Sequence, residues 1–318
     1  MIRIISRLTL LCVTISCFGC TAPTDPKQPR ILASFDAISL IVEQVVGDIP
    51  VSSLLEGGVS PHAYAPRPSE MVALREATLV VYAHPFVDGW MGGLRVQSSV
   101  SLFGEHSLSH EGPSASGFED PNSHETGMDP HQWNDPEAVL DALPGLADAL
   151  CEALSADCPA VRRRTAVFAS ELSAFQDSLH SAKPDGDGSV RCFVTAQPFM
   201  DQFLTRFEFP FVGPLSVSAD VEPSPTSLAR MVGEAHARGC RHLIVQSAFE
   251  NTLERRLARE QSWEIIEIDP LGYGAATYQH YLRGLHTALM TPGEESVRPE
   301  AQGEPSTTDS PDASTSAP

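Results

Sequence analysis

HLIVQSAFENTLERRLAREQSWEIIEI (242–268) contains the pattern that decides the fold of this chain. It joins two short apolar runs, HLIVQ (242–246) and WEIIEI (263–268), through a segment whose apolar residues have helical spacing. Short apolar runs bounded by polar or turn residues are typical of buried strands. Because strands that alternate with helices form parallel sheets covered on both faces, the stretch predicts a unit of an α/β fold.

The same alternation extends towards the N-terminus. The other strand candidates are RCFVTA (191–196) in the second half and ILASF (31–35), IPVSSLL (49–55) and TLVVYA (78–83) in the first half. Helical patterns at Ile38–Val46 and Pro68–Glu76 separate the strands of the first half. Each half therefore has the material for one parallel sheet.

A long helical region, Pro136–Ala182, lies between the two halves and is interrupted at Asp157-Cys158-Pro159. Its second part carries an apolar stripe at helical spacing, formed by Val161, Val167, Phe168, Leu172, Phe175 and Leu179. We predict two α/β lobes, each with a parallel sheet flanked by helices, joined by a long linking helix. The predicted bounds are 31–158 for the first lobe, 159–183 for the linking helix and 184–291 for the second lobe.

The N-terminus has the features of an export signal. Residues 1–19 combine the basic residues Arg3 and Arg7 with an apolar stretch too short to span a membrane. The segment SCFGC, ending at Cys20, resembles a bacterial lipobox, in which the cysteine is acylated and begins the mature chain. Simple cleavage with release of the protein is the alternative. Residues 20–30 are predicted to form a tether, and 292–318 a disordered acidic tail, since they offer little apolar surface to bury.

Composition excludes some partners and allows others. The formal net charge of -20 argues against nucleic acid, because binding to phosphates needs a basic surface. A hydrophobic content of 42% is sufficient for two globular cores in 318 residues.

Four cysteines remain once Cys12, Cys17 and Cys20 are set aside with the export signal. An even number in an oxidising compartment permits two disulfides, and sequence alone leaves three pairings open. Cys192 and Cys240 each begin a strand candidate, whereas Cys151 and Cys158 flank the break in the helical region. We therefore favour the pairs Cys151–Cys158 and Cys192–Cys240.

Polar residues follow the predicted strands at the positions where open parallel sheets bind ligands. His62 and His84 follow strands of the first half, and Gln197 and Asp269 follow strands of the second half. His131 lies just before the long helical region. Imidazole together with carboxylate or amide oxygen suits a divalent transition metal. The loop 104–128 adds three histidines that are candidates for loose metal capture, with a solvated insertion as the alternative: His106, His110 and His124.

Three motifs in order give this pattern a family resemblance. SPHAYAPRPSEM (60–71), DPHQWNDP (129–136) and IDPLG (268–272) resemble motifs of the zinc- and manganese-binding proteins of ABC importers, the cluster A-I solute-binding family. The resemblance runs from about Ile31 to Leu289. It implies an extracytoplasmic receptor, expected to be a monomer, that binds Zn²⁺ or Mn²⁺ between two lobes joined by a rigid helix and delivers the ion to a membrane permease.

The same resemblance assigns metal ligands residue by residue. His62, His131 and Asp269 match ligand positions of the family, and the remaining position, usually His or Glu, is Gln197 here. This departure puts the preferred metal in question, because an amide oxygen is a neutral and comparatively weak ligand. His84 is the candidate substitute ligand, with a role in lining the cleft as its alternative.

Two other functions remain open at this point. A metal-dependent hydrolase would also use three protein ligands, but it needs a general base beside them. The sequence has no HExxH motif, and neither Glu70 nor Glu250 stands next to a predicted ligand. A binding protein for a metal chelate would use aromatic and basic residues in its cleft, whereas these motifs supply His and Asp.

Overall fold

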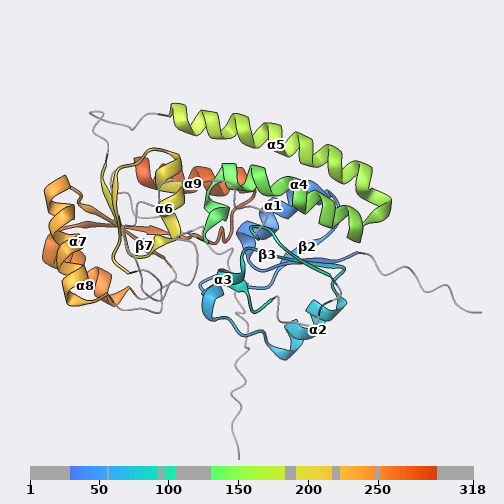
Figure 1. The fold of residues 1–318 in the computed structure, drawn as a ribbon, viewed down its shortest axis with the longest axis horizontal. Coiled ribbons are helices and arrows are strands. Elements are labelled where there is room, and N and C mark those ends of the chain that lie inside the picture. Colours follow the sequence, from blue (N-terminus) through green and yellow to red (C-terminus); the bar gives the residue numbers. More distant parts are fainter. Residues whose placement is uncertain are drawn as a thin grey trace, which may run out of the picture.

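Two four-stranded parallel sheets, one in each half of the chain, form the centre of the computed structural model (Figure 1). The structure describes residues 29–55, 57–91, 96, 98–104, 130–182, 191–216, 223–247 and 251–291. The first sheet has the order β2-β1-β3-β4. Its strands are β1 (Ile31–Ala33), β2 (Val51–Ser53), β3 (Leu79–Tyr82) and β4 (Ser99–Ser101). This half is the first lobe.

The second sheet repeats this topology with the order β6-β5-β7-β8. Its strands are β5 (Phe193–Thr195), β6 (Phe211–Pro214), β7 (His242–Gln246) and β8 (Glu264–Ile268). Strands β7 and β8 pair in register from His242 opposite Glu264 to Gln246 opposite Ile268. Side chains of successive residues enter different cores, with Phe193 and Ile244 on one face and Val194 and Leu243 on the other. This half is the second lobe.

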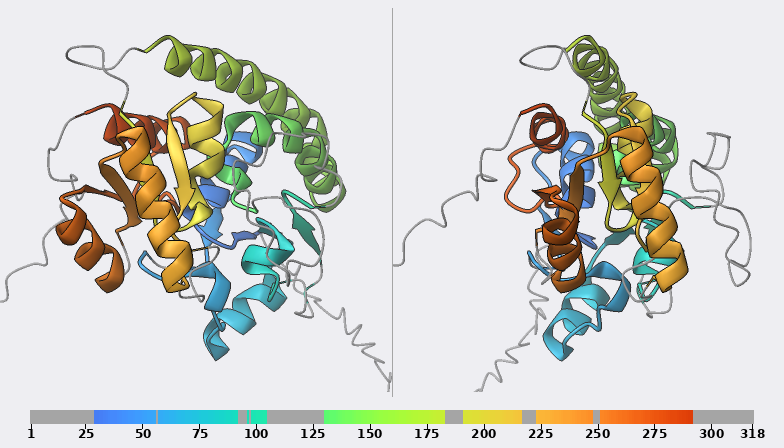
Figure 2. Two further views of the ribbon diagram at one scale, coloured as in Figure 1. Left: turned by 60° about the vertical axis from the view of Figure 1, so that its left-hand side comes forward. Right: turned by 90° about the vertical axis from the view of Figure 1, so that its left-hand side faces the viewer.

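The helices cover both faces of each sheet (Figure 2). They are α1 (Asp36–Val46), α2 (Pro68–Glu76), α3 (Pro85–Asp88), α4 (Pro136–Ala153), α5 (Cys158–Ser181), α6 (Asp201–Arg206), α7 (Pro225–Arg238), α8 (Thr252–Gln261) and α9 (Tyr278–Met290). Short 3-10 helices lie at η1 (Pro61–Ala63), η3 (Gln132–Asn134), η4 (Ser155–Asp157) and η5 (Pro198–Met200). The predicted class, two parallel α/β lobes flanked by helices, is confirmed.

Helix α5 extends across the outside of both lobes (Figures 1 and 2). It packs against α1 and α4 of the first lobe and against α9, which follows the second sheet. The Arg164 guanidinium donates from Nε and Nη2 to the carbonyl oxygens of Val45 and Val46, both at 2.8 Å. These bonds satisfy carbonyls at the end of α1, which have no partner within that helix. The linking helix is therefore fastened to the first lobe by polar contacts as well as by packing.

The predicted apolar stripe on the linking helix is wrong at one position. Val161, Phe168, Leu172 and Leu179 are buried, but Val167 is 56% exposed. The buried positions recur at intervals of seven and four residues, which keeps them on one side of a helix. Val167 precedes Phe168 by one residue and is rotated by about 100°, so it faces solvent.

The two lobes share one hydrophobic core, and the segment between His131 and Pro136 is central to it. Trp133 is 1% exposed and packs edge-on against Phe35, with ring centroids 4.8 Å apart. Its indole N–H donates to the carbonyl oxygen of Pro270 at 2.6 Å. Tyr278 donates through its hydroxyl to the Trp133 carbonyl oxygen at 2.8 Å. A single residue between the lobes therefore contacts the loop after β1, the segment after β8 and α9.

Asn134 and Asp135 continue this inter-lobe contact. The Asn134 side chain is fully buried, donates through Nδ2 to the Phe199 carbonyl oxygen at 2.6 Å and contacts the Tyr281 hydroxyl through Oδ1. Asp135 caps α4 by accepting from the Glu137 amide at 3.0 Å. The Arg206 guanidinium donates to both carboxylate oxygens of Asp135 at 2.8 Å. Bidentate Arg–carboxylate pairs are among the stronger polar contacts in proteins.

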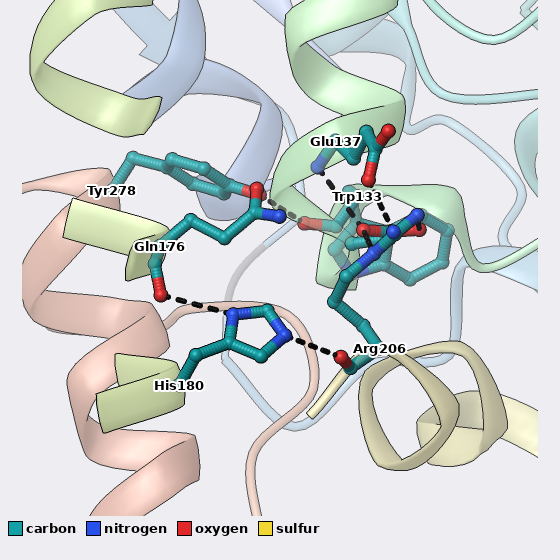
Figure 3. Close-up of polar contacts among 7 residues, drawn as sticks. Trp133, Glu137, Gln176, His180, Arg206 and Tyr278 are labelled. Atoms are coloured by element: carbon teal, nitrogen blue, oxygen red, sulfur yellow. Dashed lines mark hydrogen bonds and ion pairs between the residues drawn. The ribbon is translucent and has the colours of Figure 1, made fainter. Parts of the chain in front are cut away.

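Figure 3 shows polar contacts around Trp133 and Arg206 at this junction. Arg206 points towards Glu137, while the Tyr278 hydroxyl meets the backbone of Trp133. His180, near the end of α5, lies between the carbonyl oxygens of Gln176, at 3.2 Å, and Arg206, at 2.9 Å. Helices α5 and α6 and the segment before α4 are thus tied together at the junction of the lobes.

Both disulfides in the structure join the cysteine pairs that the sequence favours. The Cα atoms of Cys151 and Cys158 lie 4.5 Å apart, and those of Cys192 and Cys240 lie 4.4 Å apart. The first bond closes the turn between α4 and α5. The second links the starts of β5 and β7, which are neighbours in the second sheet.

We predict that Asn134→Ala destabilises the protein by about 1–3 kcal/mol, because it leaves the buried Phe199 carbonyl and the Tyr281 hydroxyl with fewer partners. Urea unfolding of the oxidised protein measures this loss. Arg162→Ala serves as the control, since it removes an exposed ion pair with Asp148 and should change the free energy of unfolding by less than about 0.5 kcal/mol. Equal stability of the Asn134 and Arg162 variants would contradict the role given to Asn134.

Candidate metal site between the lobes

Three of the polar residues singled out in the sequence lie at the carboxyl ends of strands, where open parallel sheets bind ligands. His84 comes two residues after β3, Gln197 two residues after β5 and Asp269 directly after β8. In each sheet the chain leaves the central pair of strands in opposite directions, which opens a crevice at their carboxyl ends. His62 is different, because β2 ends at Ser53 and the chain continues for several residues before His62 appears in η1. The expectation that His62 directly follows a strand is therefore wrong.

His62 and His131 face each other across a short gap. Their Nε2 atoms lie 3.4 Å apart, and their rings are tilted by 64° with centroids 5.5 Å apart. In a tetrahedral zinc site with Zn–N bonds of about 2.0–2.1 Å, two nitrogen ligands are separated by about 3.3–3.4 Å. The two imidazoles are thus spaced as two ligands of one small ion.

Backbone contacts define which nitrogen of His62 is available to a metal. The Nδ1 atom of His62 lies 3.2 Å from the carbonyl oxygen of Phe86. A carbonyl oxygen only accepts, so Nδ1 carries the proton and Nε2 carries the lone pair. That Nε2 atom is the one facing His131. Metal-binding histidines in general donate their second ring N–H in this way.

His131 is held by the inter-lobe segment described above. It is 8% exposed, and its ring packs against Trp133 with centroids 5.2 Å apart. Because Trp133 is itself fixed by Pro270 and Tyr278, the His131 backbone has little freedom to move independently of either lobe.

His84 also lies close to this pair but is engaged differently. Burial lowers the pKa of His84 below its ordinary value, and the nearby His131 ring lowers it further. Its Nδ1 atom accepts a hydrogen bond from the Phe86 amide at 3.1 Å. His84 is therefore a neutral imidazole at the edge of the site.

The second lobe contributes one side-chain amide, that of Gln246, to the same small pocket. The pocket is lined by His62, His131, Trp133, Phe199, Gln246 and Leu271, among others. Gln246 ends β7 and donates through Nε2 to Oε1 of Gln197 at 3.2 Å. Gln246 is not among the residues predicted from the sequence, although it is the last residue of the strand pattern HLIVQ and so occupies the same kind of position as Gln197.

Asp269 is turned towards its own loop. One carboxylate oxygen accepts from the Leu271 amide at 2.9 Å and the other from the Tyr273 amide at 2.6 Å. Burial raises the pKa of the Asp269 carboxyl above its ordinary value, against the effect of these two hydrogen bonds, and the charge of Asp36 raises it further. Within the described part of the chain, no three His, Cys, Asp or Glu side chains are grouped as a metal site. The structure thus brings two of the predicted ligands together, with Gln197 connected to the pocket through Gln246.

Several predicted features lie outside the described residues. They are the export signal and Cys20, the histidines His106, His110 and His124, and the tail from residue 292. Among the residues that are described, no helix has both the length and the apolar character needed to cross a bilayer.

Two α/β lobes with a paired-histidine pocket between them define a ligand-binding receptor of the two-lobed class. The chain belongs to the family described as component A, periplasmic, of the zinc-uptake complex, which matches residues 31–291.

The chain is also similar to individual proteins along most of its length. The chain is 24% identical to the high-affinity zinc uptake system protein ZnuA of Paracoccus denitrificans, over 84% of this chain and 92% of that one. It is 19% identical to the manganese-binding lipoprotein MntA of Halalkalibacterium halodurans, over 87% and 94% of the two chains. A Zn(II)-bound mutant variant of AdcAII from Streptococcus pneumoniae has the same fold, with a TM-score of 0.68, 20% identity and coverage of 83% and 100%.

We predict that His62→Ala, His131→Ala and Asp269→Ala each lower the affinity for Zn²⁺ at least about tenfold, since even the loss of a group that only supports a metal ligand costs about 10–100-fold. Competition against a chromogenic chelator measures the affinity. His236→Ala, which removes an exposed histidine bonded to Gln261 on the far helices α7 and α8, should bind as the parent does. Parent-like affinity in all three cleft variants would refute this ligand set.

Proposed function

We propose that this protein captures Zn²⁺ or Mn²⁺ in the cleft between its lobes and delivers the ion to the permease of an ABC importer. The observation that carries the proposal is the His62–His131 pair, whose Nε2 atoms are separated by 3.4 Å. The family to which the chain belongs, and the zinc and manganese proteins similar to it, support the same function.

The proposed ligand set is His62, His131, Gln197 and Asp269. The two histidines are already paired, whereas the other two ligands come from the second lobe and need small rearrangements. Asp269 has to direct a carboxylate lone pair into the cleft, and Gln197 has to exchange its contact with Gln246 for the metal. Ion binding would therefore pull the end of β8 and the end of β5 towards the histidine pair.

The charge of this set bears on release of the ion. Two neutral imidazoles, one amide and one carboxylate place a single negative charge around a divalent cation. A receptor has to give up its cargo to the permease, and a neutral amide oxygen is a weaker ligand than the Glu or His it replaces. Gln197 would thus reduce retention of the ion.

The geometry does not favour a hydrolase. Glu70, one candidate for a general base, accepts from the Tyr64 hydroxyl at 2.5 Å and from the Arg67 amide at 2.6 Å. Hydrogen bonds from Tyr64 and Arg67 lower the pKa of Glu70 in spite of its burial, so its carboxylate is a poor base. Glu250 lies outside the described residues.

Elemental analysis of the purified protein, followed by competitive titration with Zn²⁺ and Mn²⁺, tests the function and the role of Gln197 together. Gln197→His adds a nitrogen donor and should shift preference towards zinc, whereas Gln197→Glu adds a hard, charged oxygen and should favour manganese. Gln261→Glu on the outer helix α8 is the charge-matched control and should leave the preference unchanged. A protein that binds neither ion would overturn the proposed function. An unchanged preference in both Gln197 variants would remove only Gln197 from the ligand set.

We further propose that the mature chain begins at an acylated Cys20 and works from the membrane surface as a monomer. The motivation is the lipobox-like segment SCFGC, and a similar manganese-binding protein is named as a lipoprotein. Mass spectrometry of the membrane fraction should find lipid on an N-terminal Cys20. A released protein cleaved at another residue would contradict the anchor.

A further inference from the structure

A buried carboxylate, that of Asp88, holds the backbone of the segment between β3 and the end of α3. Asp88 is fully buried and accepts from the amides of Ala83, at 2.7 Å, and His84, at 2.9 Å. These contacts close the α3 turn onto the end of β3. His84 therefore starts α3 from a fixed backbone position.

The backbone of Phe86 contacts two histidine rings, one through its N–H donor and the other through its carbonyl acceptor. Its amide N–H donates to Nδ1 of His84 at 3.1 Å, and its carbonyl oxygen lies 3.2 Å from Nδ1 of His62. The first contact requires an unprotonated Nδ1 on His84, and the second requires a protonated Nδ1 on His62. One residue of α3 thus selects opposite tautomers for the two rings.

A second contact joins the turn that follows α3 to η1. The Trp90 indole N–H donates to the carbonyl oxygen of Pro61 at 2.9 Å, directly before His62. The Trp90 ring also packs against Tyr64 on the other side of His62, with centroids 5.1 Å apart. The backbone around His62 is therefore held by Trp90, while the ring of His62 is oriented by Phe86.

We propose that His84 is a positioning residue for the metal site, acting through the Phe86 backbone to hold the His62 ring with its Nε2 atom directed at His131. The inference rests on the proposed function and deepens it. By accepting the Phe86 N–H, His84 fixes the first turn of α3, as a side chain at a helix N-cap does. The Phe86 carbonyl then stays in place to accept from His62.

A direct ligand role for His84 conflicts with this geometry. A neutral imidazole that accepts through Nδ1 carries its proton on Nε2, and a protonated nitrogen has no lone pair for a metal. To bind through Nε2, His84 would have to give up the Phe86 amide. The structure therefore distinguishes His62, which presents Nε2, from His84, which supports it.

The test compares three variants in Zn²⁺ competition titrations and in the visible spectrum of the Co²⁺-loaded protein. His84→Ala removes the acceptor and should weaken Zn²⁺ binding about 10–100-fold, the usual effect of losing a group that orients a metal ligand. His84→Asn restores an acceptor suited to an N-cap and should recover most of the affinity. His280→Ala is the matched control, because His280 also accepts a backbone amide through Nδ1, from Ala276 at 3.2 Å, but lies on α9, away from the pocket.

Each outcome decides the proposal. Loss of affinity with an altered Co²⁺ spectrum in His84→Ala, recovery in His84→Asn and parent-like binding in His280→Ala would support positioning. Parent-like binding in His84→Ala would overturn it, and so would failure of His84→Asn to recover, since a required nitrogen would indicate a ligand. In both cases the parent still binds metal and the proposed function stands. A parent that binds no Zn²⁺ or Mn²⁺ would overturn the function and this inference together.

Discussion

The structure depends on the buried contact that Trp133 and Asn134 make with the second lobe. Their side chains donate to carbonyl oxygens of Pro270 and Phe199, and Tyr278 and Tyr281 of α9 complete the contact. Each hydrogen bond of this kind contributes about 0.5–1.5 kcal/mol net, so a separation of the lobes here would break several at once and would also expose the buried Trp133 ring to water. The same short segment carries His131, and the proposed metal site consequently lies where the lobes cannot easily part.

The two sides of the proposed site differ in how far their candidate ligands are already arranged to bind a metal. On one side, His62 and His131 already have the spacing of neighbouring ligands, and His62 has its lone pair directed inwards by Phe86. On the other side, Gln197 is bonded to Gln246, and Asp269 to the amides of its own loop. With the proposed ligand set, binding would begin at the two histidine nitrogens, and the oxygen ligands at the strand ends of the second lobe would then move towards the ion. Small rearrangements of this kind are compatible with lobes that share a core.

Much of the fold was predictable from the sequence because the periodicity of apolar residues reflects their burial. HLIVQ is β7 as predicted, and Pro68–Glu76 is α2. Strands β4 and β6 were missed, since SVS has little apolar character and FVGP contains the residues that usually interrupt strands. The predicted burial of Val167 was also wrong, because an apolar residue next to an apolar stripe need not belong to it.

The sequence supplies candidate residues for the site but not their contacts. Motifs and strand ends indicate His62, His131, Gln197 and Asp269 as candidates. They carry no information on tautomers, on the Gln246 partner or on the direction of the Asp269 carboxylate, because these follow from how the folded chain places its backbone and side-chain partners. The role of His84 is of the same kind, since it depends on the placement of Phe86 between two rings.

X-ray absorption at the zinc edge of the loaded protein tests whether His62 and His131 both bind the ion. We predict a shell of nitrogen and oxygen only, including two imidazoles at about 2.0–2.1 Å. The imidazole signal should fall to one ring in either His62→Ala or His131→Ala. A shell with sulfur, or one without imidazole, would contradict the assignment of the cargo site to the cleft.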